Sequence, residues 1–89
     1  MAEIQLTIQN AVGLHARPAA LFVQEANKHN AEIQVRNGDR VANAKSILSI
    51  LALGVDQGCV ITVSAEGEDA LQALAALKAL VDANFGEAR

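Results

Sequence analysis

Two segments of the chain alternate strictly between hydrophobic and polar residues. In EIQLTIQ (residues 3–9), Ile4, Leu6 and Ile8 share one face, and a period of two is typical of a half-buried strand. The segment CVITVSAEG (residues 59–67) has the same pattern, and the residues on its hydrophobic face are Cys59, Ile61, Val63 and Ala65. Both segments therefore predict strands that bury one face and leave the other in water.

Three further segments repeat their hydrophobic residues at helical spacing. The first runs from near residue 16 to residues 28–29, with a stripe made of Ala19, Phe22, Val23 and Ala26. The second, SILSILAL (residues 46–53), is a short helix with Ser46 as its expected N-cap and Gly54 as its stop. The third is longer, and its stripe is Leu71, Leu74, Leu77 and Val81. The pattern therefore predicts three helices.

The segment AEIQVRNGDRVAN (residues 31–43) predicts a β-hairpin. Ile33 and Val35 precede the pair Asn37-Gly38, and Val41 follows it. Asn-Gly favours a tight hairpin turn because both residues tolerate positive φ angles. The order of elements is thus β-α-β-β-α-β-α. Since every strand has one hydrophobic and one polar face, we expect an α+β two-layer sandwich with helices on a single side of an antiparallel sheet.

Length and charge narrow the class of protein further. The 89 residues predict a single domain that covers residues 1–89. A net charge of −3 argues against a nucleic-acid binder, which needs clustered Lys and Arg. The single cysteine, Cys59, cannot form an internal disulfide, which favours a reducing compartment. With no signal-peptide pattern and no hydrophobic run of membrane-spanning length, we expect a cytoplasmic monomer that needs no metal or organic cofactor.

The segment NAVGLHARPAA (residues 10–20) places a histidine and an arginine where the first helix begins. Pro18 fits the first turn of a helix, and the free N–H groups of that turn form a site for an anion. The helix end and Arg17 disfavour the imidazolium, which would leave His15 a neutral nucleophile. Gly13 permits a sharp turn into this arrangement. The residue types suit a site that accepts and releases phosphate.

A second interpretation stays open on this pattern alone. A histidine at a helix start also serves as an ordinary surface cap, without any chemistry. No serine or cysteine nucleophile is evidently paired with His15, and no second histidine lies close enough to suggest a metal site. His29 is interpreted as a solvated residue at the end of the first helix.

Three segments together resemble the HPr family, the histidine-containing phosphocarriers of the bacterial phosphoenolpyruvate-dependent sugar phosphotransferase system. They are GLHARPAALFVQEA, ANAKSILSILALGV and GCVITVSAEGEDA. The similarity runs in register from Ile4 to about Leu80, and the motif G-L-H-x-R-P-A is its most specific part. The resemblance implies an open-faced β-sandwich, in which three helices cover one side of a four-stranded antiparallel sheet.

The resemblance also implies a covalent carrier rather than a turnover enzyme. His15 would accept a phosphoryl group on Nδ1 from phosphorylated enzyme I, which phosphoenolpyruvate charges, and pass it to an enzyme IIA domain of a sugar permease. Arg17 and the backbone amides of Ala16 and Arg17 would hold the phosphoryl group. Two alternatives stay open: a regulatory carrier of the nitrogen-related branch, and a binding module controlled through Ser46.

A docking surface for partners is a further implication. The short helix has more hydrophobic residues than one face can bury, which indicates either a docking surface or ordinary surface leucines. In the family, this helix and the first helix dock enzyme I and IIA domains. The matching residues here are Ala20, Leu21, Gln24, Ile47, Leu48 and Leu51.

The chain departs from the family pattern at four positions. Ala16 stands where relatives often have Thr or Ser, and the positions that are often basic in relatives are here Gln24, Asn27 and Ser49. Arg17 and Lys45 then remain the main cations near the docking residues. Weaker steering of partners by long-range charge is the expected consequence.

Ser46 matches the serine that an ATP-dependent kinase modifies in some branches of the family, so a kinase or phosphorylase is a possible partner. A phosphate on Ser46 would add about −1.5 to −2 charges beside the docking residues and could repel an acidic partner. The alternative is that Ser46 only caps the short helix, which contributes about 1 kcal/mol. Both interpretations stay open, because regulation also requires a kinase that is a separate protein.

Overall fold

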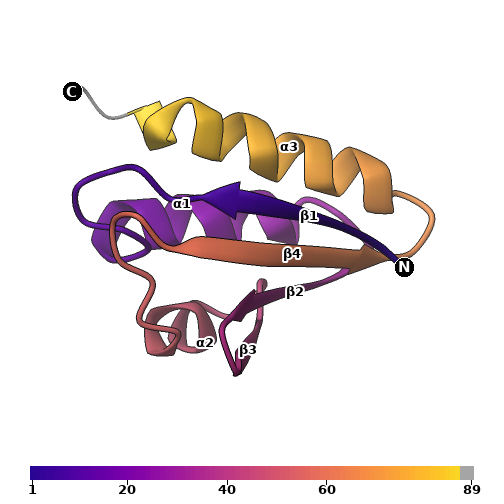
Figure 1. Cartoon of the computed structure of the whole chain (residues 1–89). Coiled ribbons are helices and arrows are strands. Elements are labelled where there is room, and N and C mark those ends of the chain that lie inside the picture. Colours follow the sequence, from indigo (N-terminus) through magenta and orange to yellow (C-terminus); the bar gives the residue numbers. More distant parts are fainter. Residues whose placement is uncertain (87–89) are drawn as a thin grey trace.

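A four-stranded antiparallel sheet forms one layer of the structure, a computed structural model that describes residues 1–86 (Figure 1). The strands are β1 (Ala2–Thr7), β2 (Glu32–Asn37), β3 (Arg40–Asn43) and β4 (Val60–Glu66). Their order across the sheet is β1-β4-β2-β3, so the first and last strands of the chain are neighbours. Each neighbouring pair is antiparallel, which confirms the predicted sheet.

Helices form the second layer. Within residues 1–86 they are α1 (Ala16–Asn27), α2 (Ile47–Ala52) and α3 (Ala70–Asp82), followed by the short 3₁₀ helix η1 (Asn84–Gly86). The β-α-β-β-α-β-α order is as predicted, whereas η1 has no signal in the hydrophobic pattern. None of the helices in this part of the chain combines the length and hydrophobicity that a membrane crossing requires.

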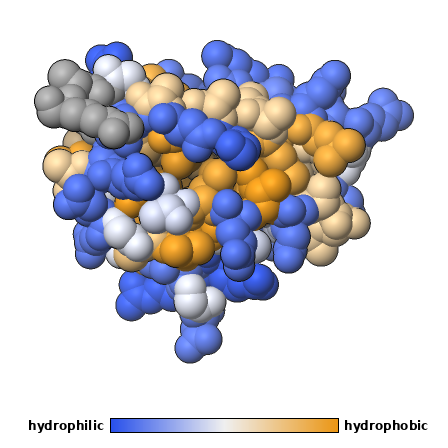
Figure 2. Space-filling view, turned by 45° about the horizontal axis from the view of Figure 1, so that its top comes forward, coloured by the Kyte–Doolittle hydropathy of each residue, from blue (hydrophilic) through white to orange (hydrophobic). Residues whose placement is uncertain are grey.

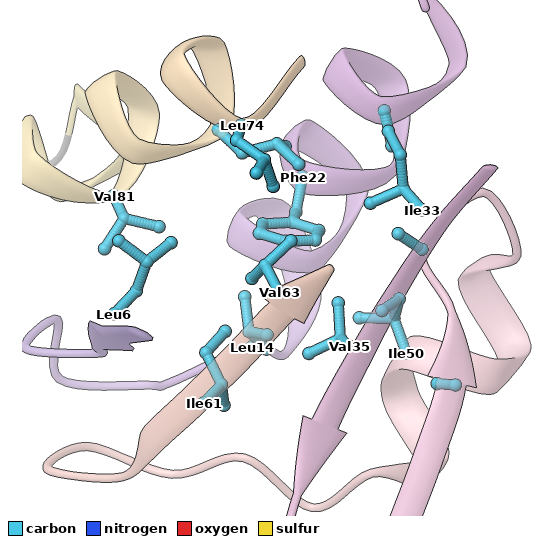
Figure 3. Packing of buried hydrophobic residues seen from close by; sticks show 14 of the residues in the cluster. Leu6, Leu14, Phe22, Ile33, Val35, Ile50, Ile61, Val63, Leu74 and Val81 are labelled. Atoms are coloured by element: carbon cyan, nitrogen blue, oxygen red, sulfur yellow. The ribbon is translucent and has the colours of Figure 1, made fainter. Parts of the chain in front are cut away.

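Phe22 of α1 lies at the centre of the hydrophobic core between the two layers. Its side chain is fully buried and points toward Val63 of β4, with Leu74 of α3 beside it (Figure 3). Farther along the sheet, Leu6 of β1 faces Val81 of α3 (Figure 3). Full burial of one such side chain contributes about 1.5–3 kcal/mol. This contiguous cluster fixes the position of each helix on the sheet.

The hairpin turn lies one residue later than the Asn-Gly pair predicts. Asn37 pairs with Arg40, so the two turn residues are Gly38 and Asp39, and Gly38 has the positive φ of +62°. Val41 pairs with the exposed Arg36 and is itself 56% exposed, whereas Ala42 pairs with the buried Val35 and is buried. A turn moved by one residue shifts each pairing by two positions and keeps every side chain on its face, so the exposure of Val41 follows from the alternation along the strand.

Leu71 of α3 also lies outside the core, although the predicted stripe includes it. It is 74% exposed, while Ala70 and Ala73 are buried and bring the start of α3 close to the sheet.

Figure 2 shows the molecule with the upper side of Figure 1, which carries α3, turned forward. Hydrophobic residues gather near the middle of this face and hydrophilic residues surround them.

His29 joins the ends of two helices instead of facing solvent. Its side chain is only 16% exposed, with Nε2 at 3.3 Å from Glu25 Oε2 and Nδ1 at 3.4 Å from Asp69 Oδ2. Asp69, just before α3, also accepts hydrogen bonds from the backbone N–H groups of Asn30 and Ala31. The interpretation of His29 as a solvated residue is therefore wrong, because the start of α3 folds against the end of α1.

Candidate functional site

Two loops meet at one end of the sheet. One follows β1 and leads into α1, and the other follows α2 and leads into β4. Since β1 and β4 are antiparallel neighbours, the end of β1 and the start of β4 lie together, as Figure 1 shows. Backbone hydrogen bonds join the loops, with Leu14 N–H donating to Val55 O at 2.9 Å and Gly58 N–H donating to Ile8 O at 2.7 Å.

Gly13 lets the two loops approach each other closely. Its φ is +65°, and a Cβ at this position would lie 2.2 Å from Val55 O and 2.7 Å from Asp56 Cα. Residues with side chains rarely adopt this backbone conformation, and no side chain fits in the space. Gly13 therefore shapes the turn, as predicted, and also holds the second loop against the first.

Asn10 fixes the same turn, and the hydrophobic pattern gives no sign of it. Its side chain is buried, and Nδ2 donates to Gly13 O at 2.8 Å while Gly13 N–H donates to Asn10 O at 3.2 Å. Asn is common in turns because its side chain bonds the nearby backbone. An asparagine three residues before a glycine, just after a strand, is the signal that could have found it.

His15 is the N-cap residue of α1. Its backbone is extended, its side chain is 41% exposed, and that side chain makes no hydrogen bond to the first amides of the helix. The next residue, Ala16, has a φ of +51°, in the left-handed region that costs an alanine about 1–2 kcal/mol. The imidazole therefore stands beside a helix N-terminus whose amides it does not itself cap.

Arg17 provides the cation that the sequence predicts near His15. The residue is exposed at the first turn of α1, and Pro18 behind it is buried. Among the ion pairs formed by residues 1–86, none involves the Arg17 guanidinium. The guanidinium can therefore turn toward an anion at the helix N-terminus without first giving up a carboxylate partner in this part of the chain.

Asp56 is a charged neighbour of His15 that no sequence pattern predicts. Its Oδ1 lies 3.4 Å from His15 Nε2, and its side chain is 78% exposed. The residue belongs to the second loop, and the close approach at Gly13 brings its Cα next to the first. No local pattern could have paired the two side chains, because they come from loops that are far apart in sequence.

The predicted docking residues lie on α1 and α2. On α2, Ile47, Leu48 and Leu51 are 39%, 77% and 38% exposed, while Ile50 and Leu53 are buried. This division confirms that the short helix has more hydrophobic residues than the core accepts. On α1, the remaining members of the set are the half-buried Ala20 and Leu21 and the exposed Gln24.

The two helices run in opposite directions. Asn27, the last residue of α1, donates from Nδ2 to Lys45 O at 3.2 Å, just before α2 begins. After α2 ends, Val55 O accepts from Leu14 N–H at the start of α1. The exposed residues of α2 therefore lie between Ser46 at one end and the His15 site at the other.

Lys45 is not a cation beside His15. Its Nζ donates to His29 O at 2.6 Å, beyond the C-terminal end of α1. A 12-residue helix is about 18 Å long, so α1 separates this ammonium from the His15 site. Of the two cations expected near the docking residues, Lys45 therefore lies just before α2 with its ammonium bound to a backbone carbonyl, and Arg17 lies at the His15 end of α1.

Ser46 caps α2 as predicted. Its Oγ accepts from Ser49 N–H at 3.3 Å, and its backbone is extended in the way typical of an N-cap. The described residues include no group of three His, Cys, Asp or Glu side chains arranged to hold a metal ion.

Known proteins that are similar to this chain belong to the family that the sequence motifs resemble. A family model described as "PTS HPr component phosphorylation site" matches residues 2–83. The HPr-like protein Crh of Halalkalibacterium halodurans is 43% identical over 82 residues, which cover 92% of this chain and 98% of that protein. The crystal structure of HPr-C-His from Thermoanaerobacter tengcongensis matches with a TM-score of 0.98 and 49% identity over 100% of both chains. An HPr dimer from the same organism matches with a TM-score of 0.80 and 50% identity, over 98% of this chain and 100% of that one.

Proposed function

The chain belongs to the HPr family of phosphocarriers of the phosphotransferase system, and from this premise we propose that His15 is its phosphoryl acceptor. The donor in this proposal is enzyme I, phosphorylated by phosphoenolpyruvate, and the acceptors are enzyme IIA domains of sugar permeases. The chain is then a covalent carrier that supports sugar uptake. It is not an enzyme with turnover of its own.

One observation carries the proposal. His15 is a half-exposed imidazole at the N-terminus of α1, and two residues later Arg17 is exposed and has no ion-pair partner in residues 1–86. A helix N-terminus and a guanidinium are both good partners for a phosphoryl group. The other histidine, His29, is largely buried between two carboxylates and lacks such surroundings.

The transfer step follows from these groups. The lone pair of His15 Nδ1 attacks phosphorus, and the N–P bond forms as the bond between phosphorus and the donor breaks. The electron pair of the broken bond stays on the donor. Arg17 and the backbone N–H groups of Ala16 and Arg17 hold the phosphoryl oxygens, since positioning and charge stabilisation provide most of the catalysis in phosphoryl transfer. The same steps in reverse order transfer the phosphoryl group from Nδ1 to the next acceptor.

A labelling experiment tests the proposal. Purified protein is incubated with enzyme I and labelled phosphoenolpyruvate, and we expect it to gain a phosphate that is labile in acid and stable in base. His15→Ala should gain none, and the matched variant His29→Ala should be labelled like the original chain. Absence of label from any enzyme I tested, or equal labelling of His15→Ala, would contradict the proposal.

The acceptor branch is tested in the same assay. The labelled protein is offered IIA domains of the sugar type and, in parallel, acceptors of the nitrogen-related type. We expect faster transfer to the sugar type. A preference for the second group would identify a regulatory carrier with the same chemistry at His15.

Control through Ser46 is a second candidate function. The position of Ser46 at the start of α2, beside the exposed hydrophobic residues of that helix, favours it. A cell extract from the host, supplied with ATP, should then phosphorylate the chain and Ser49→Ala but not Ser46→Ala. Phosphorylation of Ser46→Ala to the same extent would contradict it.

We also propose that the chain acts as a monomer. The exposed hydrophobic residues of α2 are then free for partner proteins. Sedimentation equilibrium should give the mass of one chain across the working range of concentration. A mass that rises to twice this value at those concentrations would contradict the proposal.

A further inference from the structure

We propose that Asp56 is a positioning residue for His15, holding the imidazole with its protonated nitrogen Nε2 toward the carboxylate and leaving the lone pair on Nδ1. This inference deepens the proposed function and rests on it, since it concerns the reactivity of the same histidine. It assigns a role in the transfer to the second loop of the site, which the sequence motif around His15 does not include.

The structure holds Asp56 in place from both sides. Val55 before it is fully buried, and the Val55 carbonyl accepts from Leu14 N–H. After it, Cys59 N–H donates to Asp56 O at 3.1 Å. The absent side chain at Gly13 lets the Asp56 backbone lie directly against the turn that leads to His15. The backbone of two joined loops therefore fixes the point from which the Asp56 side chain reaches His15.

The contact involves one particular nitrogen of the ring. Asp56 Oδ1 lies 3.4 Å from Nε2, and no other carboxylate of residues 1–86 is within ion-pair distance of His15. A neutral imidazole carries its proton on one nitrogen and its lone pair on the other, and the partner of one nitrogen decides which. A carboxylate at Nε2 favours the proton there. Nδ1 then has the lone pair that attacks phosphorus.

The same carboxylate faces the charge that develops in the transfer. When the N–P bond forms at Nδ1 and Nε2 keeps its proton, the ring becomes positively charged. Asp56 stabilises this charge at Nε2, while the cationic Arg17 and the α1 amides act on the phosphoryl oxygens. A carboxylate that orients a histidine by its second nitrogen has the same role in other nucleophilic and metal-binding sites.

Because the Asp56 side chain is exposed, we expect its replacement to have a small effect, and mainly on His15. An ion pair between exposed groups changes an equilibrium by up to about fivefold, so Asp56 should matter little for folding. Its effect should be seen in the tautomer of His15 and in the transfer rate. If Asp56 had a purely structural role, a variant of unchanged stability would also keep the tautomer ratio of His15 and the transfer rate.

The decisive measurement is the tautomer ratio of His15 in the free, unphosphorylated protein. Long-range proton–nitrogen correlation NMR of isotope-labelled protein distinguishes the two tautomers at about pH 8.5, where imidazole side chains are neutral. We expect Nε2–H to predominate, and its ratio to Nδ1–H to fall about two- to fivefold in Asp56→Ala. Asp56→Asn separates the carboxylate charge from the oxygen acceptor and provides a second folded variant. The matched control Glu3→Gln removes one exposed carboxylate from the start of β1 and should leave the ratio unchanged.

A transfer assay completes the test. Asp56→Ala should accept phosphate from enzyme I about two- to fivefold more slowly, and Glu3→Gln at the original rate. An unchanged tautomer ratio in both Asp56 variants overturns this inference even if the original chain transfers phosphate well. Conversely, a shifted ratio in a chain that accepts no phosphate supports the orientation of His15 by Asp56 and overturns the proposed function instead.

Discussion

At the scale of single residues, the site depends on a position that has no side chain. Gly13 has a positive φ and lies so close to Val55 and Asp56 that a Cβ would overlap their backbone. Gly38 in the hairpin turn has almost the same φ, +62°, but open space around it. The two glycines separate the cost of the backbone conformation from the cost of steric overlap.

We expect Gly13→Ala to lower the free energy of unfolding by more than about 2 kcal/mol, because strain and overlap add. Gly38→Ala should cost only about 1 kcal/mol, the strain alone. Urea unfolding of both variants measures the two losses. Equal losses would show that the loops can separate without cost at Gly13. Since the overlap involves the Asp56 backbone, Gly13→Ala should also disturb the His15–Asp56 contact.

At the scale of the elements, α2 is a short helix that depends on its ends. It has six residues, and isolated helices of that length are unstable in water. Ser46 caps its first turn, and the side chains of Asn37 and Arg40 donate to Leu53 O and Ala52 O at its other end. The hairpin and the cap therefore hold the helix that carries the predicted docking residues Ile47, Leu48 and Leu51.

Replacing the cap should destabilise the protein. We expect Ser46→Ala to lose about 1 kcal/mol of stability and Ser46→Asp to keep most of it, since aspartate is also a good N-cap. Ser49→Ala, one turn later, should be neutral because alanine is the best helix former. Thermal and urea unfolding report these differences. A loss in Ser49→Ala equal to that in Ser46→Ala would contradict a specific capping role.

The contact between the end of α1 and the start of α3 makes the stability of the fold depend on pH in the acidic range. The pKa of Asp69 is lowered from its ordinary 3.8, chiefly because the backbone N–H of Asn30 donates to its carboxylate. Partial burial acts in the opposite direction, and the N–H of Ala31 and the charge of His29 lower the pKa further. A group whose pKa is lower in the folded state stabilises that state above its unfolded pKa. The stabilisation is lost as the pH falls through the lower folded value.

We therefore expect the chain to lose stability as the pH falls from about 5 to below 3.8. Asp69→Asn should be less stable at neutral pH, since an amide oxygen cannot replace a carboxylate for two N–H donors, and its stability should fall less over the same range. Urea unfolding at a series of pH values measures both curves. The control Asp39→Asn, at the exposed hairpin turn, should follow the original chain. Parallel curves for the original chain and Asp69→Asn would contradict the role of Asp69.

At the scale of the whole molecule, the packing of α2 against α1 and the sheet decides which hydrophobic residues remain exposed. Ile50 and Leu53 enter the core, and the residues left outside lie between Ser46 and the His15 site. An exposed hydrophobic surface next to a reactive residue is typical of a partner interface. Leu48, at 77% exposure, is its most exposed large residue.

Leu48→Glu should weaken docking without affecting the fold. We expect the apparent KM for phosphorylated enzyme I to rise about tenfold, with unchanged urea unfolding. Leu71→Glu is the matched control, because Leu71 is a leucine of similar exposure, 74%, on α3. It should leave transfer unchanged. Equal effects of the two variants would indicate a general effect of charge and no docking surface at α2.

Sequence by itself determined the order of the elements, most of the core and the N-cap at Ser46. Each of these depends on residues within a few positions of one another, so periodicity and capping rules apply directly. Gly13, His15 and Arg17 also lie within one short segment, and the candidate site could be recognised there.

Only the tertiary structure decided which distant groups meet. The contacts of His15 with Asp56 and of His29 with Asp69 join segments far apart in the chain, and no local pattern encodes them. The exposure of Leu71 depends on how α3 packs on the sheet, because a small rotation of a helix changes its buried face. The position of the hairpin turn depends on how β2 pairs with both β3 and β4. The sequence thus identified the histidine, and the fold supplied the carboxylate beside it.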